Sequence, residues 1–253
     1  MPTRLMHVVI DAADPERQAG FWSEVFGWQT QAGEDGEVMI LPAGWRYPDP
    51  GPVPLLFVPA GEPETGRNRV HIDVPTKSPA YFEDEVKRII ALGATPADIG
   101  QGDVPWEVLA DPEGNELCVL DPRPDVYFDT GPLAAIVVGC ADPAAIAGFW
   151  AQASGFRRSA SRSGENIAAL RAPVVRGPFL ELIRDPDAAA HGGRIRLDVA
   201  PPADGDLDEA VTELLAAGAR PADGGQVNAP WITLSDREGF EFRVLTPPDA
   251  PLS

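Results

Sequence analysis

Apolar residues recur along the chain with two periods, one typical of strands and one typical of helices. Residues 7–11 alternate, with Val8 and Ile10 on one side and polar positions on the other, as in a half-buried strand. Asp14 and the proline after it then form a typical helix start, and Gly27 is a typical helix end. The apolar stripe of this predicted helix consists of Ala19, Trp22, Val25 and Phe26.

The same order of elements occurs twice in the first half of the chain. Short strands are predicted near residues 38–41 and 54–58, and another strand covers residues 70–74. A helical pattern follows, with apolar positions at Phe82, Val86, Ile89 and Ile90. Gly93 ends that helix, and two strands are predicted near residues 107–110 and 116–120. Each half of this region therefore predicts a β-α-β-β-β module.

An internal repeat then organises the whole chain. Residues 69–120 align without a gap on residues 194–245, and Asp14-Pro15 recurs as Asp142-Pro143. The proline-rich stretch between the copies is typical of a semi-rigid linker. We therefore expect two domains, residues 1–122 and 133–253. The predicted fold is α+β, with four βαβββ modules, concave sheets and helices on the outer face.

Composition narrows the range of partners. The chain has 253 residues, of which 44% are hydrophobic, enough for ordinary cores. Its 39 acidic and 20 basic residues give a formal charge of −19, which opposes nucleic acid and anionic membranes. This charge favours a cationic small-molecule ligand or simply keeps the protein in solution. With two cysteines, no apolar run of membrane-spanning length and no signal-peptide core, we expect a cytoplasmic protein, either a monomer or a homodimer.

Strand alternation gathers metal-ligand side chains on the concave face of the first domain. His71 and Asp73 lie opposite the aliphatic residues of their strand, and His7 occupies the same side of the first strand. Glu116 and Cys118 occupy that side of the last strand. Two imidazoles and a carboxylate can hold a divalent ion such as Fe, Mn, Ni, Co or Zn, which would polarise the oxygens of a chelating substrate.

Two motifs carry a resemblance to a known family. The chain begins its first module with His-x-x-Ile-Asp-x-x-Asp-Pro and closes its second with Asp-Pro-Glu-Gly-Asn-Glu-Leu-Cys-Val-Leu. Both resemble the vicinal-oxygen-chelate (VOC) superfamily of glyoxalases, bleomycin-resistance proteins and extradiol dioxygenases, in particular its glyoxalase-like two-domain actinobacterial type. The resemblance implies tandem glyoxalase-like domains and metal ligands at His7, His71 and Glu116. Near Leu55 or Leu56, where glyoxalase I carries a carboxylate, this chain has none, so the set resembles that of extradiol dioxygenases.

The second domain departs from this pattern. Ala135 stands in the place of His7 and Arg196 in the place of His71, whereas Glu241 is kept. Glu181 appears on the strand that corresponds to Leu55–Leu56. A guanidinium near these carboxylates would replace the metal charge, so we expect a metal-free domain.

Several other residues are open to two interpretations. Trp106 and its repeat partner Trp231 belong either to the core or to a pocket wall, and Trp45 is either part of a ligand lid or a packing anchor. Cys118 is interpreted as a pocket-lining residue, and His191 as a loop residue. The predicted substrate-binding residues are Trp45, Asp73, Trp106, Cys118, Arg196 and Glu241. The repeated Asp-x-Glu-Gly turns at 111–114 and 236–239 are interpreted as structural.

Three functions remain open at this point. The first is a metal-dependent lyase, isomerase or dioxygenase that acts on an enediolate- or catechol-like substrate. The second is a non-catalytic binder of a small molecule or antibiotic, and the third is a subunit whose repeated fold serves assembly. The first assumes that modules one and two share a concave face. If modules two and three pair instead, the ligand set becomes His71, Glu116 and Glu181, and His7 lies apart.

Overall fold

A computed structural model describes residues 3–46, 51–60, 66–122, 127, 129–222 and 229–247. It contains the four expected modules, each made of a strand, a helix and three further strands. The first two modules comprise β1 (Arg4–Ala12), α1 (Pro15–Phe26), β2 (Gln29–Ala32), β3 (Val38–Leu41), β4 (Leu55–Pro59), β5 (Val70–Val74), α2 (Pro79–Ala91), β6 (Thr95–Pro96), β7 (Glu107–Ala110) and β8 (Glu116–Val119).

The second copy repeats the order, with a 3-10 turn added before its fourth module. Its elements are β9 (Ala135–Cys140), α4 (Pro143–Ser154), β10 (Arg157–Arg158), β11 (Ile167–Arg171), β12 (Phe179–Arg184), η1 (Ala188–Ala190), β13 (Ile195–Ala200), α5 (Leu207–Ala216), β14 (Arg220–Pro221), β15 (Trp231–Ser235) and β16 (Glu241–Leu245). In the part of the chain that the structure describes, no helix is long and apolar enough to cross a membrane.

The helices begin and end where the sequence predicts. The Asp14 carboxylate accepts a hydrogen bond from the backbone N–H of Arg17, and Gly27 ends α1 in the left-handed conformation with φ of 65°. Asp142 caps α4 in the same way, and Gly155 ends it with φ of 74°. Local chemistry therefore sets the helix limits.

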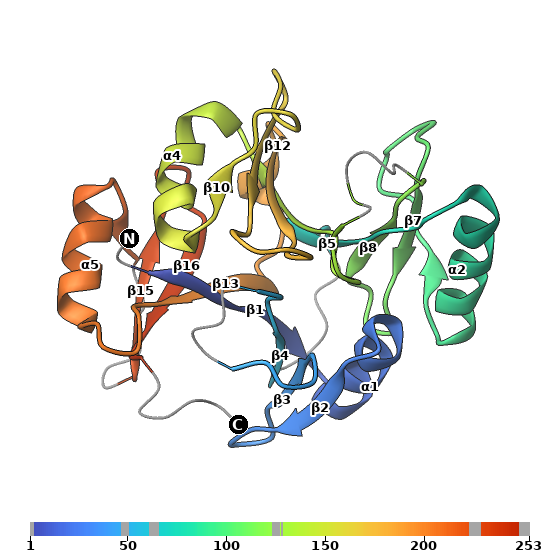
Figure 1. The fold of residues 1–253 in the computed structure, drawn as a ribbon, viewed down its shortest axis with the longest axis horizontal. Coiled ribbons are helices and arrows are strands. Elements are labelled where there is room, and N and C mark those ends of the chain that lie inside the picture. Colours follow the sequence, from blue (N-terminus) through green and yellow to red (C-terminus); the bar gives the residue numbers. More distant parts are fainter. Residues whose placement is uncertain are drawn as a thin grey trace.

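The modules pair across the two halves of the chain. One eight-stranded sheet has the order β14-β15-β16-β13-β1-β4-β3-β2, and the other has the order β10-β11-β12-β9-β5-β8-β7-β6. At their centres β1 pairs with β13 and β5 pairs with β9, both antiparallel (Figure 1). Module one thus shares a sheet with module four, and module two with module three. The assumption that modules one and two share a concave face is wrong.

The helices, in contrast, pack within each half of the chain. Arg88 of α2 donates hydrogen bonds to the carbonyl oxygens of Glu24 and Val25 at the end of α1, at 3.0 Å each. Trp22 and Trp150 lie fully buried between helix and sheet, as expected from their apolar stripes. A continuous apolar core therefore joins both sheets through the helices, and none of α1, α2, α4 and α5 covers the opposite face of either sheet.

The repeated Asp-x-Glu-Gly turns connect these modules. Glu113 accepts hydrogen bonds from the backbone N–H groups of Ala13 and Asp14 at 2.9 and 2.8 Å, and from Arg194 at 2.8 Å. Asp111 accepts a hydrogen bond from the indole nitrogen of Trp22 at 3.1 Å. Glu238 and Asp236 make the corresponding contacts with residues 141–142 and the Trp150 indole. These contacts account for the repeated acids as structural residues.

Candidate ligand-binding cups

The face of each sheet away from α1, α2, α4 and α5 forms a cup. We call the face of the β1–β13 sheet the first cup and that of the β5–β9 sheet the second cup. His7 lies in the first cup, whereas His71 and Glu116 lie in the second. The structure therefore does not bring together the three metal ligands that the resemblance implied.

Strand alternation places His7 in the first cup, and a β-bulge beside it turns Met6 to the same side. The register of β1 shifts between Leu5 and His7, so that Met6 and His7 both lie on the side away from the core, while Leu5 and Val8 face the helices. Bulges commonly re-aim a side chain in this way. The His7 ring is only 4% exposed, and its Nδ1 lies 3.7 Å from Asp198 Oδ2. Neither ring nitrogen forms a hydrogen bond with a described residue.

Asp198 holds an arginine against an aromatic wall of the first cup. Arg243 donates from Nε and Nη2 to the two Asp198 oxygens at 2.8 and 2.6 Å. Its guanidinium carbon lies 4.7 Å from the centre of the Trp231 ring. Asp198 is completely buried, which by itself would raise its pKa, but the nearby His7 ring and the hydrogen-bonded Arg243 guanidinium hold that pKa below its usual value. The carboxylate therefore stays charged and fixes Arg243.

A second guanidinium lies one row along the same sheet. Arg196 donates from Nη1 to Asp11 Oδ1 at 2.5 Å. Its register position on β13 corresponds to that of His71 on β5. Glu241, on the neighbouring strand β16, has no hydrogen bond or ion pair with a described residue. The first cup thus contains two arginines, each bound by an aspartate, and the carboxylate of Glu241, which makes no such contact with a described residue.

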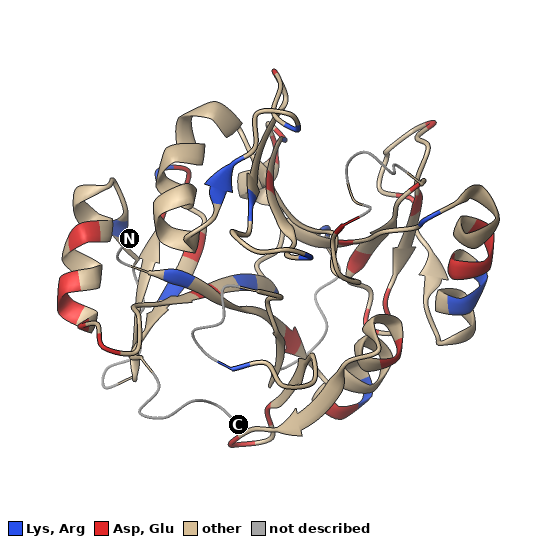
Figure 2. Cartoon of the chain, in the orientation of Figure 1, with Lys and Arg blue, Asp and Glu red and all other residues tan. Residues whose placement is uncertain are grey.

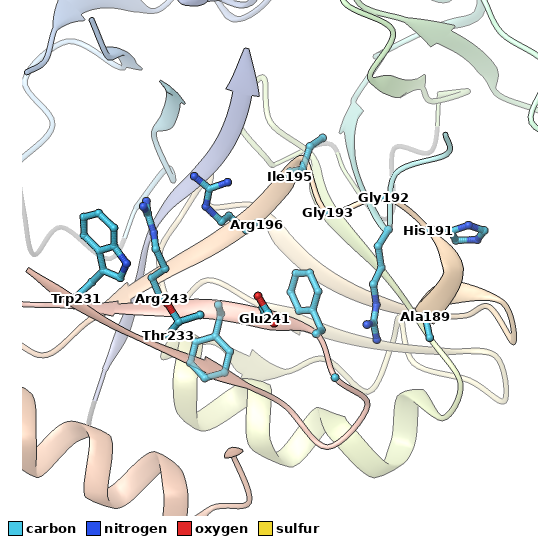
Figure 3. A pocket seen from close by; sticks show the side chains of 14 residues that line it. Ala189, His191, Gly192, Gly193, Ile195, Arg196, Trp231, Thr233, Glu241 and Arg243 are labelled. Carbon is cyan, nitrogen blue, oxygen red and sulfur yellow. The ribbon is translucent and has the colours of Figure 1, made fainter. Parts of the chain in front are cut away.

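A pocket of about 460 Å³ opens on this part of the first cup. Figure 3 shows Arg196, Arg243 and Trp231 projecting to the same side of the sheet. Figure 2 shows basic residues on the central strands of this sheet and acidic residues along α5. The polar and aromatic lining includes Arg69, Arg196, Trp231, Thr233, Glu241 and Arg243. The pocket surface is thus richer in arginine than the net charge of the chain implies.

Another part of the first cup is apolar. Trp45 packs there at 6% exposure, so it is a packing anchor, and its role toward a ligand stays a prediction. The other side chains of this surface are Met6, Val9, Met39, Leu41, Leu56, Val58, Ala200 and Leu245. A molecule bound in the first cup would therefore find an arginine-rich end beside an apolar wall.

The second cup brings three donor side chains together. One ligand atom each from His71, Asp73 and Cys118 lie within 4.8 Å of one another, and His71 Nε2 is 3.5 Å from Asp73 Oδ1. Burial, followed by the charge of Arg67, lowers the pKa of His71 to about 4, so its ring is neutral at neutral pH. Burial, followed by the charge of Asp73, raises the pKa of the Cys118 thiol. This agrees with Cys118 not being a nucleophile.

The two glutamates of the second cup are engaged by neighbouring side chains. Asn68 donates to Glu116 from its backbone N–H at 3.2 Å and from Nδ2 at 2.8 Å. Glu181 accepts hydrogen bonds from Arg162 Nε at 2.9 Å and from the Tyr127 hydroxyl at 3.1 Å. Arg162 also contacts the Tyr127 hydroxyl. Glu181 is therefore already paired, which counts against the alternative set of His71, Glu116 and Glu181.

Tyr127, from the segment between the two repeats, packs into the apolar cluster of the second cup. It is 3% exposed and packs edge-on against Phe179 at a centroid distance of 5.8 Å. Trp106 packs at the edge of the same apolar cluster and is half-buried, whereas its repeat partner Trp231 lines the pocket of the first cup. Both tryptophans are therefore cup walls rather than core residues.

Comparison with known proteins identifies the family to which this fold belongs. A family model described as the glyoxalase-like domain matches residues 7–120 and again residues 135–245. The chain belongs to this glyoxalase-like family. A search of curated protein sequences gave no match. The resemblance to the VOC superfamily and the prediction of two tandem glyoxalase-like domains of the α+β class are confirmed.

Solved structures of glyoxalase-like folds superpose on almost the whole chain. Glyoxalase I from Zea mays has a TM-score of 0.61 and 15% identity, with 97% of this chain and 92% of that chain covered. A proposed dioxygenase from Bacillus subtilis has a TM-score of 0.60 and 15% identity, with 98% and 86% covered. At these identities the likeness concerns the fold alone.

A glyoxalase-like fold raises the question of which residues fit a metal. The imidazole, carboxylate and thiol of His71, Asp73 and Cys118 form a donor set that suits a borderline ion such as Zn²⁺ or Co²⁺. In the first cup, His7 faces Asp198 and the arginines instead. The second cup therefore fits a metal better than the first.

Sequence reasoning missed several residues of this glyoxalase-like protein. Asp198 and Arg243 occupy the concave registers next to Arg196 and Glu241, so strand alternation alone could have indicated both. Tyr127 lies in the proline-rich linker, where no periodic pattern exists. Nothing in the sequence indicated that it enters a cup.

Proposed function

We propose that the chain binds a small organic molecule in the pocket of the first cup and does so without a metal ion. The observation that supports this most is the wall of Arg196, Arg243 and Trp231 around a pocket of about 460 Å³. That volume lies within the range of ordinary ligand sites, which combine apolar walls with a few placed polar groups. The binding function, rather than assembly alone, accounts for polar side chains held in this cup.

The position of Arg196 supports a metal-free site. In the register where the second module carries His71, the fourth carries a guanidinium fixed by Asp11. A permanent cation at this point would repel a divalent ion and can itself interact with a ligand oxygen. His7 has no second imidazole opposite it on β13.

The repeat supplies a matched pair of variants for the test. Trp231→Ala opens the wall of the first cup, and Trp106→Ala removes the equivalent ring from the second. We would screen small organic carboxylates, alcohols and amines by thermal unfolding of the wild type and both variants. Ligands that raise the Tm of the wild type and of Trp106→Ala, but not of Trp231→Ala, are expected. Stabilisation that depends on Trp106 instead would move the site to the second cup.

A second candidate function rests on the donor group of the second cup. A divalent ion held by His71, Asp73 and Cys118 would supply Lewis-acid chemistry to a substrate with neighbouring oxygens. His71 is neutral at neutral pH and can therefore donate its lone pair, whereas Cys118 would have to release its proton on binding. This candidate retains the metal-dependent enzyme of the sequence-based prediction with a different ligand set.

Elemental analysis after reconstitution with each ion tests the metal candidate. Near-stoichiometric metal is expected in the wild type and in the His191→Ala control, and its loss is expected in His71→Ala. Cobalt(II) should also give a thiolate charge-transfer band that disappears in Cys118→Ser. Metal that survives in His71→Ala but is lost in His7→Ala would place the ion in the first cup and contradict both proposals.

A further inference from the structure

We propose that the molecule bound in the first cup is a flat, largely apolar carboxylate whose oxygens are held by Arg196 and Arg243. This inference rests on the proposed function and names its ligand class. It departs from the expectation, based on the net charge of −19, that the ligand is a cation. The reasons lie in the hydrogen-bond donors that the pocket leaves available, in its local charge and in its aromatic wall.

The two guanidiniums keep donors for a ligand. Arginine has five N–H donors in a planar fork. Arg243 uses Nε and Nη2 for Asp198, and its Nη1 donates to no described residue. Arg196 uses Nη1 for Asp11, and its Nε and Nη2 donate to no described residue. Both side chains line the pocket, so a ligand carboxylate can accept hydrogen bonds from each.

The acids that hold these arginines fix them without lining the pocket. Asp198 is fully buried, and neither Asp11 nor Asp198 belongs to the pocket lining. A third arginine, Arg69, also lines the pocket, but its guanidinium donates to the carbonyl oxygens of Gly139 and Glu238. Glu241 is the single carboxylate among the described lining residues. Among the lining side chains, a cationic ligand would therefore be repelled by the guanidinium groups and attracted by Glu241 alone, whereas an anion would be attracted by the guanidinium groups.

The side chains around the pocket indicate the shape of the rest of the ligand. Trp231 is half-buried, lines the pocket and is covered on one side by the Arg243 guanidinium at 4.7 Å from the ring centre. Guanidinium and indole planes both stack on flat groups. Val9, the register partner of Arg196 on β1, continues the surface from the pocket to the apolar side chains Leu56 and Val58 of β4. A planar acid can thus place its carboxylate at the arginines and its body against apolar surface.

Three probes with one carbon skeleton test the charge preference. Cinnamate, cinnamyl alcohol and cinnamylamine carry a negative, neutral and positive end group at neutral pH. Isothermal titration calorimetry on the full chain should give the tightest binding for cinnamate, by roughly tenfold or more over the alcohol, because charged hydrogen bonds are lost in the alcohol. In Trp231→Ala all three probes should bind more weakly.

Variants assign the preference to the arginines. Arg196→Gln and Arg243→Gln should each reduce cinnamate affinity by about tenfold and leave the alcohol nearly unchanged. Arg220→Gln, at an exposed position on β14 of the same sheet, is the matched control and should change neither. If Arg243→Gln fails to fold, because it leaves Asp198 buried without its partner, Arg196→Gln and the three wild-type affinities still decide the question.

The outcomes separate the two proposals. Tightest binding of the amine, or equal binding of all three probes that still depends on Trp231, would overturn the carboxylate class and retain the pocket as a binding site. No saturable binding of any probe would overturn the carboxylate class, and a negative thermal-unfolding screen beside it would also remove the proposed function. A cinnamate preference that survives both arginine variants would assign it to other residues and equally reject this inference.

Discussion

At the scale of single residues, the buried ion pair of Asp198 and Arg243 is the contact of the first cup whose loss should cost the most stability. Asp198→Asn removes the charge that Arg243 faces and should destabilise the protein by about 3 kcal/mol, because a half-broken buried pair leaves a charge without compensation. Asp11→Asn, at the partly exposed partner of Arg196, should cost less than about 1 kcal/mol. Urea unfolding of both variants measures this difference, and equal losses would contradict it.

This contact also has a defined pH dependence. The pKa of Asp198 is held below its usual value, so its contribution to stability is present above the unfolded pKa near 4 and is lost as the pH falls through the folded pKa. The stability gap between the wild type and Asp198→Asn should therefore narrow only in strong acid. A gap that narrows already between pH 7 and 5 would point to a different group.

His71 should produce a loss of stability in the same direction, but at milder pH. Its pKa is lowered to about 4, so between pH 6.5 and 4 the unfolded chain takes up a proton that the folded metal-free protein does not. Stability should fall through this range by at most about 3 kcal/mol, and His71→Gln should lose this part of the pH dependence. Unfolding with a chelator present, across pH 4–8, measures it. Parallel curves for both proteins would refute the expectation.

At the scale of elements, the Glu113 carboxylate binds the backbone at the start of α1. Glu113 binds two N–H groups before α1 and also binds Arg194, so Glu113→Gln should cost about 2 kcal/mol. Glu16→Gln, in the first turn of the same helix, should remain within about 0.5 kcal/mol of the wild type. Guanidinium unfolding compares them, and an equal effect would reduce Glu113 to an ordinary surface acid.

Elements were also the scale at which sequence reasoning worked best. The strand at 70–74, the helix limits at Asp14 and Gly27, and the concave direction of His7 follow from local periodicity and capping, which need no knowledge of distant contacts. The pairing of modules does not follow, because four similar modules offer similar first strands to one another. The metal set that assumed pairing of modules one and two therefore placed His7 beside His71, whereas the sheets separate them.

At the scale of the whole molecule, each sheet needs both halves of the chain. Residues 1–122 alone would leave the edges of β1 and β5 without β13 and β9, and exposed central edges favour association. We expect this fragment to dimerise or aggregate, and to form a one-to-one complex when co-expressed with residues 123–253. Size-exclusion chromatography with light scattering tests this. A folded monomer of residues 1–122 would contradict it.

The pairing of module one with four and of module two with three also affects how the two cups can diverge during evolution. Two identical single-domain subunits would form two identical cups, and every substitution would alter both. Fusion of the copies into one chain makes the cups independent, since one is built from modules one and four and the other from modules two and three. A linker tyrosine can therefore pack into one cup while its sibling keeps an arginine-lined pocket. Duplication here frees one binding site to diverge while the other preserves the scaffold.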